Sequence, residues 1–68
     1  MSVGGFAVCV ERRGYRASLE LWKVYRVVRD DGAARARLVR VVDESGEDYL
    51  YPREWFAPVA LPRSLRRR

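Results

Sequence analysis

Apolar and polar residues alternate along five short stretches of the chain, and turn-forming residues separate these stretches. The first stretch is residues 5–11, where Phe6, Val8 and Val10 would share one side of an extended strand. The other stretches are residues 23–30, 35–43, 48–52 and 57–62. The pattern predicts an all-β protein, a small five-stranded barrel or sandwich, and closing the sheet into a barrel would remove exposed strand edges.

The connections carry turn signals of their own. Asp31-Gly32 predicts a tight hairpin between the second and third strands, and Ser45-Gly46 predicts another between the third and fourth. Pro52 cannot donate to a strand ladder and closes the fourth strand. Residues 53–56 are too few for an α-helix, so we expect a single 3-10 turn before the last strand.

Two segments resemble signatures of SH3 domains. "SLELWKVYRVV" is similar to the diverging turn of that family, in which an apolar-x-apolar pair precedes a lysine-containing turn and an alternating strand. The matching positions here are Leu19, Leu21, Trp22, Lys23, Tyr25 and Val27. In "YLYPREWFAPV", Pro52 and Trp55 match the apolar-Pro-x-x-aromatic run near the end of an SH3 domain.

The resemblance covers roughly residues 5–61 and implies an SH3-like barrel, similar to small bacterial proteins of that shape. It also implies a binding role, because Pro52 and Trp55 match positions of the pocket that SH3 domains use for proline-rich peptides. Tyr15, in the loop after the first strand, could add a further aromatic side chain to that surface.

The chain has 68 residues, which is enough for one domain with a small core, since a domain of this size buries only about 60% of its unfolded surface. We assign residues 1–62 to the barrel. Cys9 is the single cysteine and there is no histidine, which excludes an intramolecular disulfide and the usual zinc sites. A buried, reduced Cys9, with no signal peptide or membrane-spanning stretch, indicates a cytoplasmic protein.

The net charge of +5 is concentrated at one end of the chain. Residues 63–68 contain four arginines, whereas residues 1–62 contain ten basic and nine acidic side chains. Leu65 is the single apolar residue of this tail, and its burial would not offset the entropy lost on ordering six residues. We therefore expect residues 63–68 to be a mobile basic tail whose removal leaves the melting temperature nearly unchanged.

Four carboxylates surround Gly46 in "DESGED". They lack the spacing and length of a calcium loop, and a solvated turn does not separate the pKa values of two acids as catalysis requires. We interpret the segment as a turn with solvated charges. Because no nucleophile has a base or a cationic neighbour, we expect no enzyme activity, no metal and no cofactor.

Eight large aromatic residues are more than a core of this size needs. We expect Phe6, Tyr25 and Phe56 in the core, and Tyr49 and Tyr51 on one face of their strand. Trp22 and Trp55 fall in turns, where full burial is difficult, although they could instead close the ends of the barrel. The first hypothesis is a non-catalytic module that binds a protein through an aromatic surface patch. Its candidate residues are Tyr15, Trp22, Pro52 and Trp55.

A second hypothesis uses the arginines. Arg35, Arg37 and Arg40 fall on the third predicted strand, and Arg66 and Arg67 lie in the tail. Basic residues interleaved with aromatics on a small barrel can bind single-stranded nucleic acid. Nearby carboxylates would cancel much of this field, so nucleic acid is the less favoured partner.

Overall fold

The computed structural model describes residues 3–60 and confirms the all-β class. The strands are β1 (Val3–Cys9), β2 (Val24–Val28), β3 (Leu38–Val42), β4 (Asp48–Pro52) and β5 (Phe56–Val59), with a short helix α1 (Asp31–Arg35) and the 3-10 helix η1 (Arg53–Trp55). The expected 3-10 turn before the last strand is confirmed. The predicted tail, with Arg66 and Arg67, lies outside the described residues.

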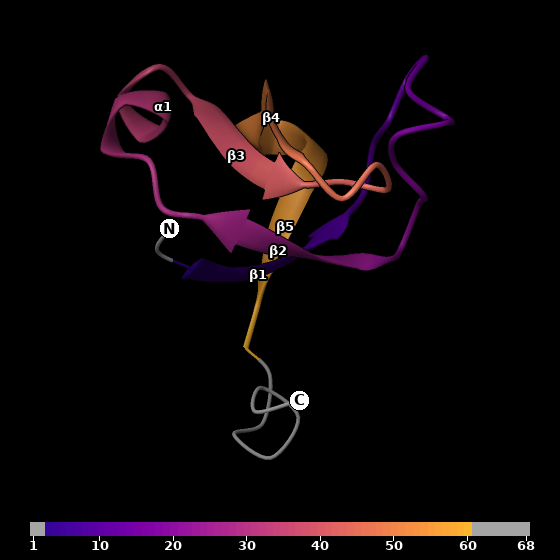
Figure 1. Cartoon of the computed structure of the whole chain (residues 1–68), viewed down its shortest axis with the longest axis horizontal. Helices are drawn as coiled ribbons and strands as arrows, with labels where there is room; N and C mark the ends of the chain where they lie inside the picture. Colours follow the sequence, from indigo (N-terminus) through magenta and orange to yellow (C-terminus); the bar gives the residue numbers. More distant parts are fainter. Residues whose placement is uncertain (1–2, 61–68) are drawn as a thin grey trace.

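The five strands form one antiparallel sheet in the order β4-β3-β2-β1-β5. The sheet curls into a barrel-like shape, with β3 and β4 above β1 and β2, and with β5 running from η1 across to β1 (Figure 1). This arrangement is compatible with an SH3-like fold. Within the described chain β5 is an edge strand, which accommodates Pro58 opposite Ala7, because a proline offers no N–H to a further strand.

The core contains Ala7 and Cys9 from β1, but not Phe6. The other members of the buried cluster are Leu19, Tyr25, Val41, Tyr51, Trp55 and Phe56. The expectation that Phe6 belongs to the core is wrong, because its side chain is only partly buried. Both faces of β1 are apolar, so alternation alone did not identify the inward face. Ala7 lies beside Tyr25 of β2 and Cys9 beside Phe56 of β5, so each small residue has a buried aromatic neighbour.

The predicted hairpin at Asp31-Gly32 is instead the first turn of α1. Asp30 is extended and its carboxylate accepts a 2.9 Å hydrogen bond from the backbone N–H of Ala33, as an N-cap residue does. Ala33 is the buried residue of this helix. The following strand therefore begins at Leu38 and not at residue 35, because residues 31–35 are helical.

A long loop, residues 10–23, connects β1 to β2 and is fastened at its base. The N–H of Cys9 donates to the carbonyl of Lys23 at 3.0 Å, and the N–H of Trp22 donates to the carbonyl of Cys9 at 2.7 Å. Leu19 is fully buried, whereas Leu21 is exposed. The two leucines of the diverging-turn motif therefore do not share one side, and Leu19 alone joins the core.

Candidate functional site

One surface site forms where the loop of residues 10–23 meets β4. The ring of Tyr15 lies edge-on to Tyr51, with ring centroids 5.6 Å apart, and its centroid is 5.5 Å from that of Trp55. Tyr15 is still half exposed, whereas Tyr51 and Trp55 are buried. The buried pair thus supports Tyr15 from below, and aromatic contacts of this geometry add to the stability gained from burial.

Tyr15 lines a pocket of about 380 Å³ together with Tyr49 and Leu50. The exposed fractions of these three side chains are 52%, 49% and 43%. Ser18, Asp43, Ser45 and Tyr51 complete the lining. We call Tyr15, Tyr49 and Leu50 the tyrosine surface. It brings half-exposed apolar side chains from two distant parts of the chain around one depression.

A hydrogen-bond network centred on the buried carboxylate of Asp43 forms one wall of this pocket. The hydroxyl of Tyr51 donates to Asp43 Oδ2 at 2.6 Å, and the N–H and hydroxyl of Ser45 donate to Asp43 Oδ1 at 2.9 and 2.5 Å. Burial raises the pKa of Asp43, but the hydrogen bonds from Ser45 and Tyr51 outweigh it, so the net pKa lies below the usual value. Burial, and then the bond to Asp43, raises the pKa of Tyr51 to about 12.

These shifts define what the network can do at neutral pH. Asp43 is ionised and cannot act as a general acid, and Tyr51 keeps its proton and cannot act as a base. The network therefore holds the turn after β3 against the core. Among the described residues, no group of three or more histidine, cysteine, aspartate or glutamate side chains is arranged to hold a metal ion.

A second polar cluster surrounds the carboxylate of Glu44, the residue after Asp43 in the same turn. Glu44 accepts a hydrogen bond from the hydroxyl of Tyr25 and pairs with Lys23 Nζ at 2.6 Å. The N–H of Glu20 donates to the same Tyr25 hydroxyl at 2.8 Å. The hydrogen bond from Lys23, followed by that from Tyr25, holds the pKa of Glu44 below its usual value. This cluster ties the loop of residues 10–23 to the turn after β3.

The structure separates the residues that the sequence grouped as one partner site. Tyr15 contacts Trp55, but Trp55 is only 6% exposed and acts as support for Tyr15. Pro52 lines a different pocket, and Trp22 lines neither of these two pockets. Trp22 is 72% exposed and has a φ of 65°, in the left-handed region.

The site also contains three residues that were not predicted to bind a partner: Tyr49, Leu50 and Asp43. Two signals were present: Tyr49 and Tyr51 are two residues apart on one strand, and Asp43-x-Ser45 has the spacing at which an aspartate accepts from the backbone two residues on. The contact between Tyr15 and Tyr51 of β4 had no local signal, because it joins residues far apart in sequence.

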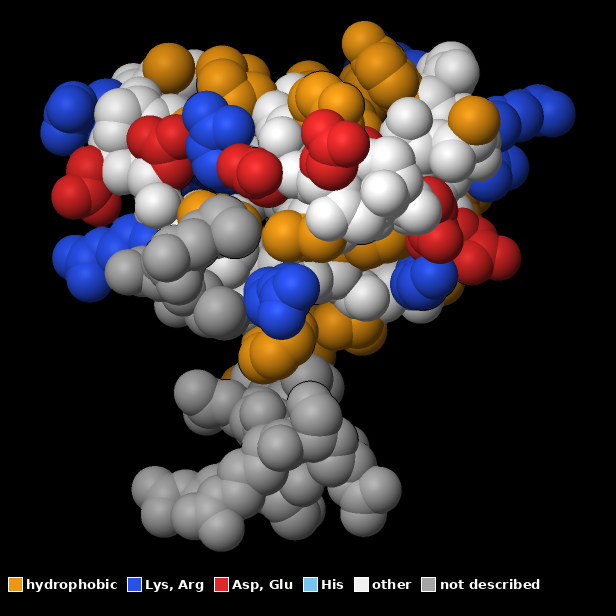
Figure 2. Space-filling view, in the orientation of Figure 1, with side chains coloured by type: hydrophobic (Ala, Val, Ile, Leu, Met, Phe, Trp, Pro, Cys, Tyr) orange, Lys and Arg blue, Asp and Glu red, His pale blue; other side chains and the backbone are white. Residues whose placement is uncertain are grey.

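The arginines of the second hypothesis are also dispersed. Arg35 is in the last turn of α1, and Arg37 follows the helix with a φ of 60°. Arg40 pairs with Asp30 at 2.9 Å and with Asp48 at 3.1 Å, so two carboxylates neutralise it. Acidic and basic side chains are interleaved on the face shown in Figure 2. Arg40 therefore lies on β3 as predicted, whereas the prediction that Arg35 and Arg37 lie on that strand is wrong.

Comparison with known proteins gives no relative: no family model matches the chain, and no curated protein or solved structure matches it. Within residues 3–60, no helix has the length and apolar character needed to cross a membrane.

Proposed function

We propose that this chain is a non-catalytic binding module that holds a segment of a partner protein against the tyrosine surface. The observation that carries the proposal is the joint lining of one pocket by Tyr15, Tyr49 and Leu50, each about half exposed. Large side chains with a polar end are enriched at the centres of protein interfaces, because they bury much area at a small entropic cost.

The support beneath Tyr15 favours this use of the surface. The rings of Tyr51 and Trp55 restrict the positions that Tyr15 can take, so less side-chain entropy would be lost when a partner binds. The hydroxyl of Tyr51 already donates to Asp43, whereas the hydroxyl of Tyr15 has no partner within the described hydrogen-bond network. Tyr15 therefore offers both an apolar face and a polar group to a ligand.

The resemblance of two segments to SH3 domains supports the same function. The strand order and the position of η1 before β5 are compatible with that fold, in which the corresponding loop and 3-10 turn border a peptide site. Cys9 is a buried, unpaired cysteine, which is compatible with a reducing compartment, and we propose a cytoplasmic location.

Site-specific photo-crosslinking tests this function. A photoreactive phenylalanine analogue is placed at Tyr49, on the tyrosine surface, or at Ala34, which is exposed on α1. We expect a discrete adduct in host-cell extract from position 49 and none from position 34, and we expect Tyr15→Ala to remove it. The segment identified by mass spectrometry would then bind the purified protein in calorimetry.

Two outcomes contradict the proposal. Equal adducts from both positions would indicate non-specific contact, and an adduct at position 49 that survives Tyr15→Ala would place the partner elsewhere. Tyr15→Phe serves as a control that keeps the ring contacts with Tyr51 and Trp55.

Nucleic-acid binding remains the alternative function. Arg35 and Arg37 are exposed and, among the described residues, form no ion pair. This alternative predicts binding of a single-stranded oligonucleotide with an affinity that falls steeply with salt concentration. A flat anisotropy titration at low salt would exclude it.

A further inference from the structure

A larger pocket, of about 720 Å³, opens on a different part of the barrel and shares no lining residue with the pocket of the tyrosine surface. Its apolar lining comes from Phe6, Ala7, Val27, Val39, Pro52, Phe56 and Pro58. Val27 and Val39 pack against the hydrophobic core, so the pocket reaches the barrel interior. The volume and the apolar lining are those of a small-molecule site.

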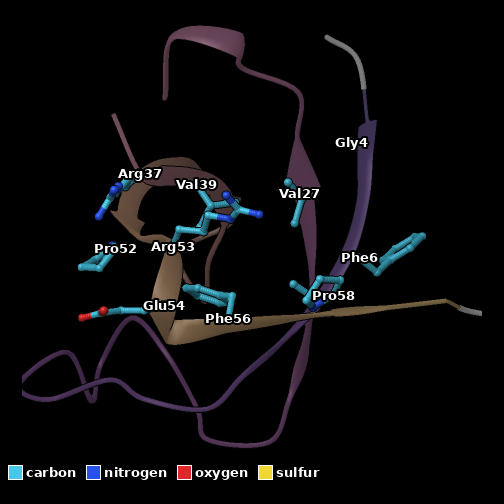
Figure 3. A pocket seen from close by; sticks show the side chains of 11 residues that line it. Gly4, Phe6, Val27, Arg37, Val39, Pro52, Arg53, Glu54, Phe56 and Pro58 are labelled. Carbon is cyan, nitrogen blue, oxygen red and sulfur yellow. The ribbon is translucent and has the colours of Figure 1, made fainter. Parts of the chain in front are cut away.

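Two exposed arginines, Arg37 and Arg53, line this pocket, and only the side chain of Arg53 is directed across it. Figure 3 shows the Arg53 side chain extending from η1 past Val39 toward the wall that contains Val27, whereas Arg37 and Glu54 point away from the pocket. The backbone of η1 is fixed at this point, because the N–H of Arg53 donates to the carbonyl of Arg37 at 3.1 Å.

Like Arg35, Arg37 and most of the described basic residues, Arg53 forms no ion pair. Lys23, Arg29 and Arg40 each have a carboxylate within 4 Å. A guanidinium beside an apolar cavity, with no carboxylate of its own, has its donors available for an anionic ligand.

We propose that this pocket binds a compact apolar group that carries a carboxylate, with the apolar part between Val27 and Phe56 and the carboxylate on Arg53. A neutral apolar ligand would leave Arg53 without an anion, and a cation would be repelled by it. The chain's own residues 61–68 fit poorly as the occupant, because they contain four arginines. The proposal does not depend on the function of the tyrosine surface.

Titration of the full-length, ¹⁵N-labelled protein with 2-naphthylacetate tests the proposal by NMR. We expect saturable shifts of the backbone amides of Gly4, Val39, Arg53 and Phe56, and little change at Tyr15 and Tyr49. The neutral analogue 2-naphthylacetamide should bind more weakly, and Arg53→Gln should lower the affinity for the acid about three- to tenfold, as expected for a partly exposed charge-assisted hydrogen bond.

Arg29→Gln is the matched control, because Arg29 is an exposed arginine outside the pocket lining. It should leave the affinity for the acid unchanged. On the Arg53→Gln protein, the acid and the amide should bind alike.

Several results would overturn the proposal. These are the absence of saturable shifts, equal affinities of acid and amide for the wild-type protein, an equal loss in both arginine variants, and shifts confined to the tyrosine surface. Nuclear Overhauser contacts between Leu65 and Val27 in the free protein would also overturn it, since they would show that the chain fills its own pocket.

Discussion

The hydroxyl of Tyr51 lies 2.6 Å from Oδ2 of Asp43, and both side chains are buried. This bond connects β4 to the turn that follows β3. The same carboxylate accepts from the N–H of Ser45, and the N–H of Asp43 donates to the carbonyl of Glu47 at 3.1 Å. The acidic segment is therefore a turn, as predicted, but the expectation that its charges are all solvated is wrong for Asp43, whose carboxylate is buried.

Replacing Tyr51 by phenylalanine tests the worth of this bond. We expect Tyr51→Phe to lower the free energy of unfolding by about 1–3 kcal/mol, because the buried carboxylate of Asp43 loses a donor while the ring packing is kept. Urea denaturation measures the change. Tyr49→Phe is the control: Tyr49 is half exposed and its hydroxyl is 3.4 Å from Glu47, so little change is expected. Equal effects would show that the Asp43 bond has no special role.

Asp43 also predicts how stability depends on acid. Its pKa in the folded protein lies below the ordinary value of 3.8, so its contribution is complete above that value and is lost as the pH falls through the folded pKa. Glu44 shifts in the same direction. The urea concentration at the unfolding midpoint should therefore stay constant from neutral pH to about pH 4 and decrease at lower pH. Asp43→Asn should flatten this decline, and an unchanged slope would assign the acid sensitivity to other carboxylates.

The tyrosines predict a second loss of stability, in alkali. The pKa of Tyr51 is raised from the ordinary value of 10.0 to about 12, and that of Tyr25 is also raised, in both cases mainly by burial. A raised folded pKa gives stability that is complete below pH 10 and is lost as the pH rises through the folded value. Tyrosinate absorbance and unfolding should then rise together above pH 10 in the wild type. Early ionisation of all tyrosines in a still-folded protein would contradict this.

Local sequence patterns were sufficient for the strands and for η1, because alternation and Pro52 act at short range. They were insufficient at Asp31-Gly32, where capping by Asp30 and the alanines that follow favoured a helix turn over a hairpin. Trp55 looked exposed because it lies in a turn, but η1 directs its ring onto Tyr51. Contacts of this kind join distant segments, which explains why Tyr15 was identified and its neighbours Tyr49 and Leu50 were not.

The N-cap of α1 offers a test of the unpredicted helix. Asp30 accepts from the N–H of Ala33 at 2.9 Å and pairs with Arg40 at 2.9 Å. Asp30→Ala should lower the free energy of unfolding by about 1–2 kcal/mol, since both the cap and the ion pair are lost. Asp31→Ala is a matched control, because Asp31 makes only an exposed pair with Arg29 at 3.7 Å. Equal effects of the two substitutions would argue against a capping role for Asp30.

Substitution of the two tryptophans should affect stability to very different extents. Trp55 is 6% exposed and contacts Tyr15 and Tyr51, whereas Trp22 is 72% exposed. Replacing a buried tryptophan by alanine costs about 3–5 kcal/mol, which approaches the total stability of a domain of this size. We therefore expect the circular dichroism spectrum of Trp55→Ala to be that of a largely unfolded protein. The free energy of unfolding of Trp22→Ala should lie within about 0.5 kcal/mol of the wild-type value.

This difference decides which variant can locate a binding site. Loss of partner binding in Trp55→Ala would reflect unfolding, so it would say nothing about direct contact. Tyr15→Ala removes a half-exposed ring and leaves Tyr51 and Trp55 in the core, so the protein should remain folded while binding is lost. If Trp55→Ala instead keeps a cooperative melting transition and loses binding, Trp55 contacts the partner directly, and its burial in the free protein is relieved when the partner binds.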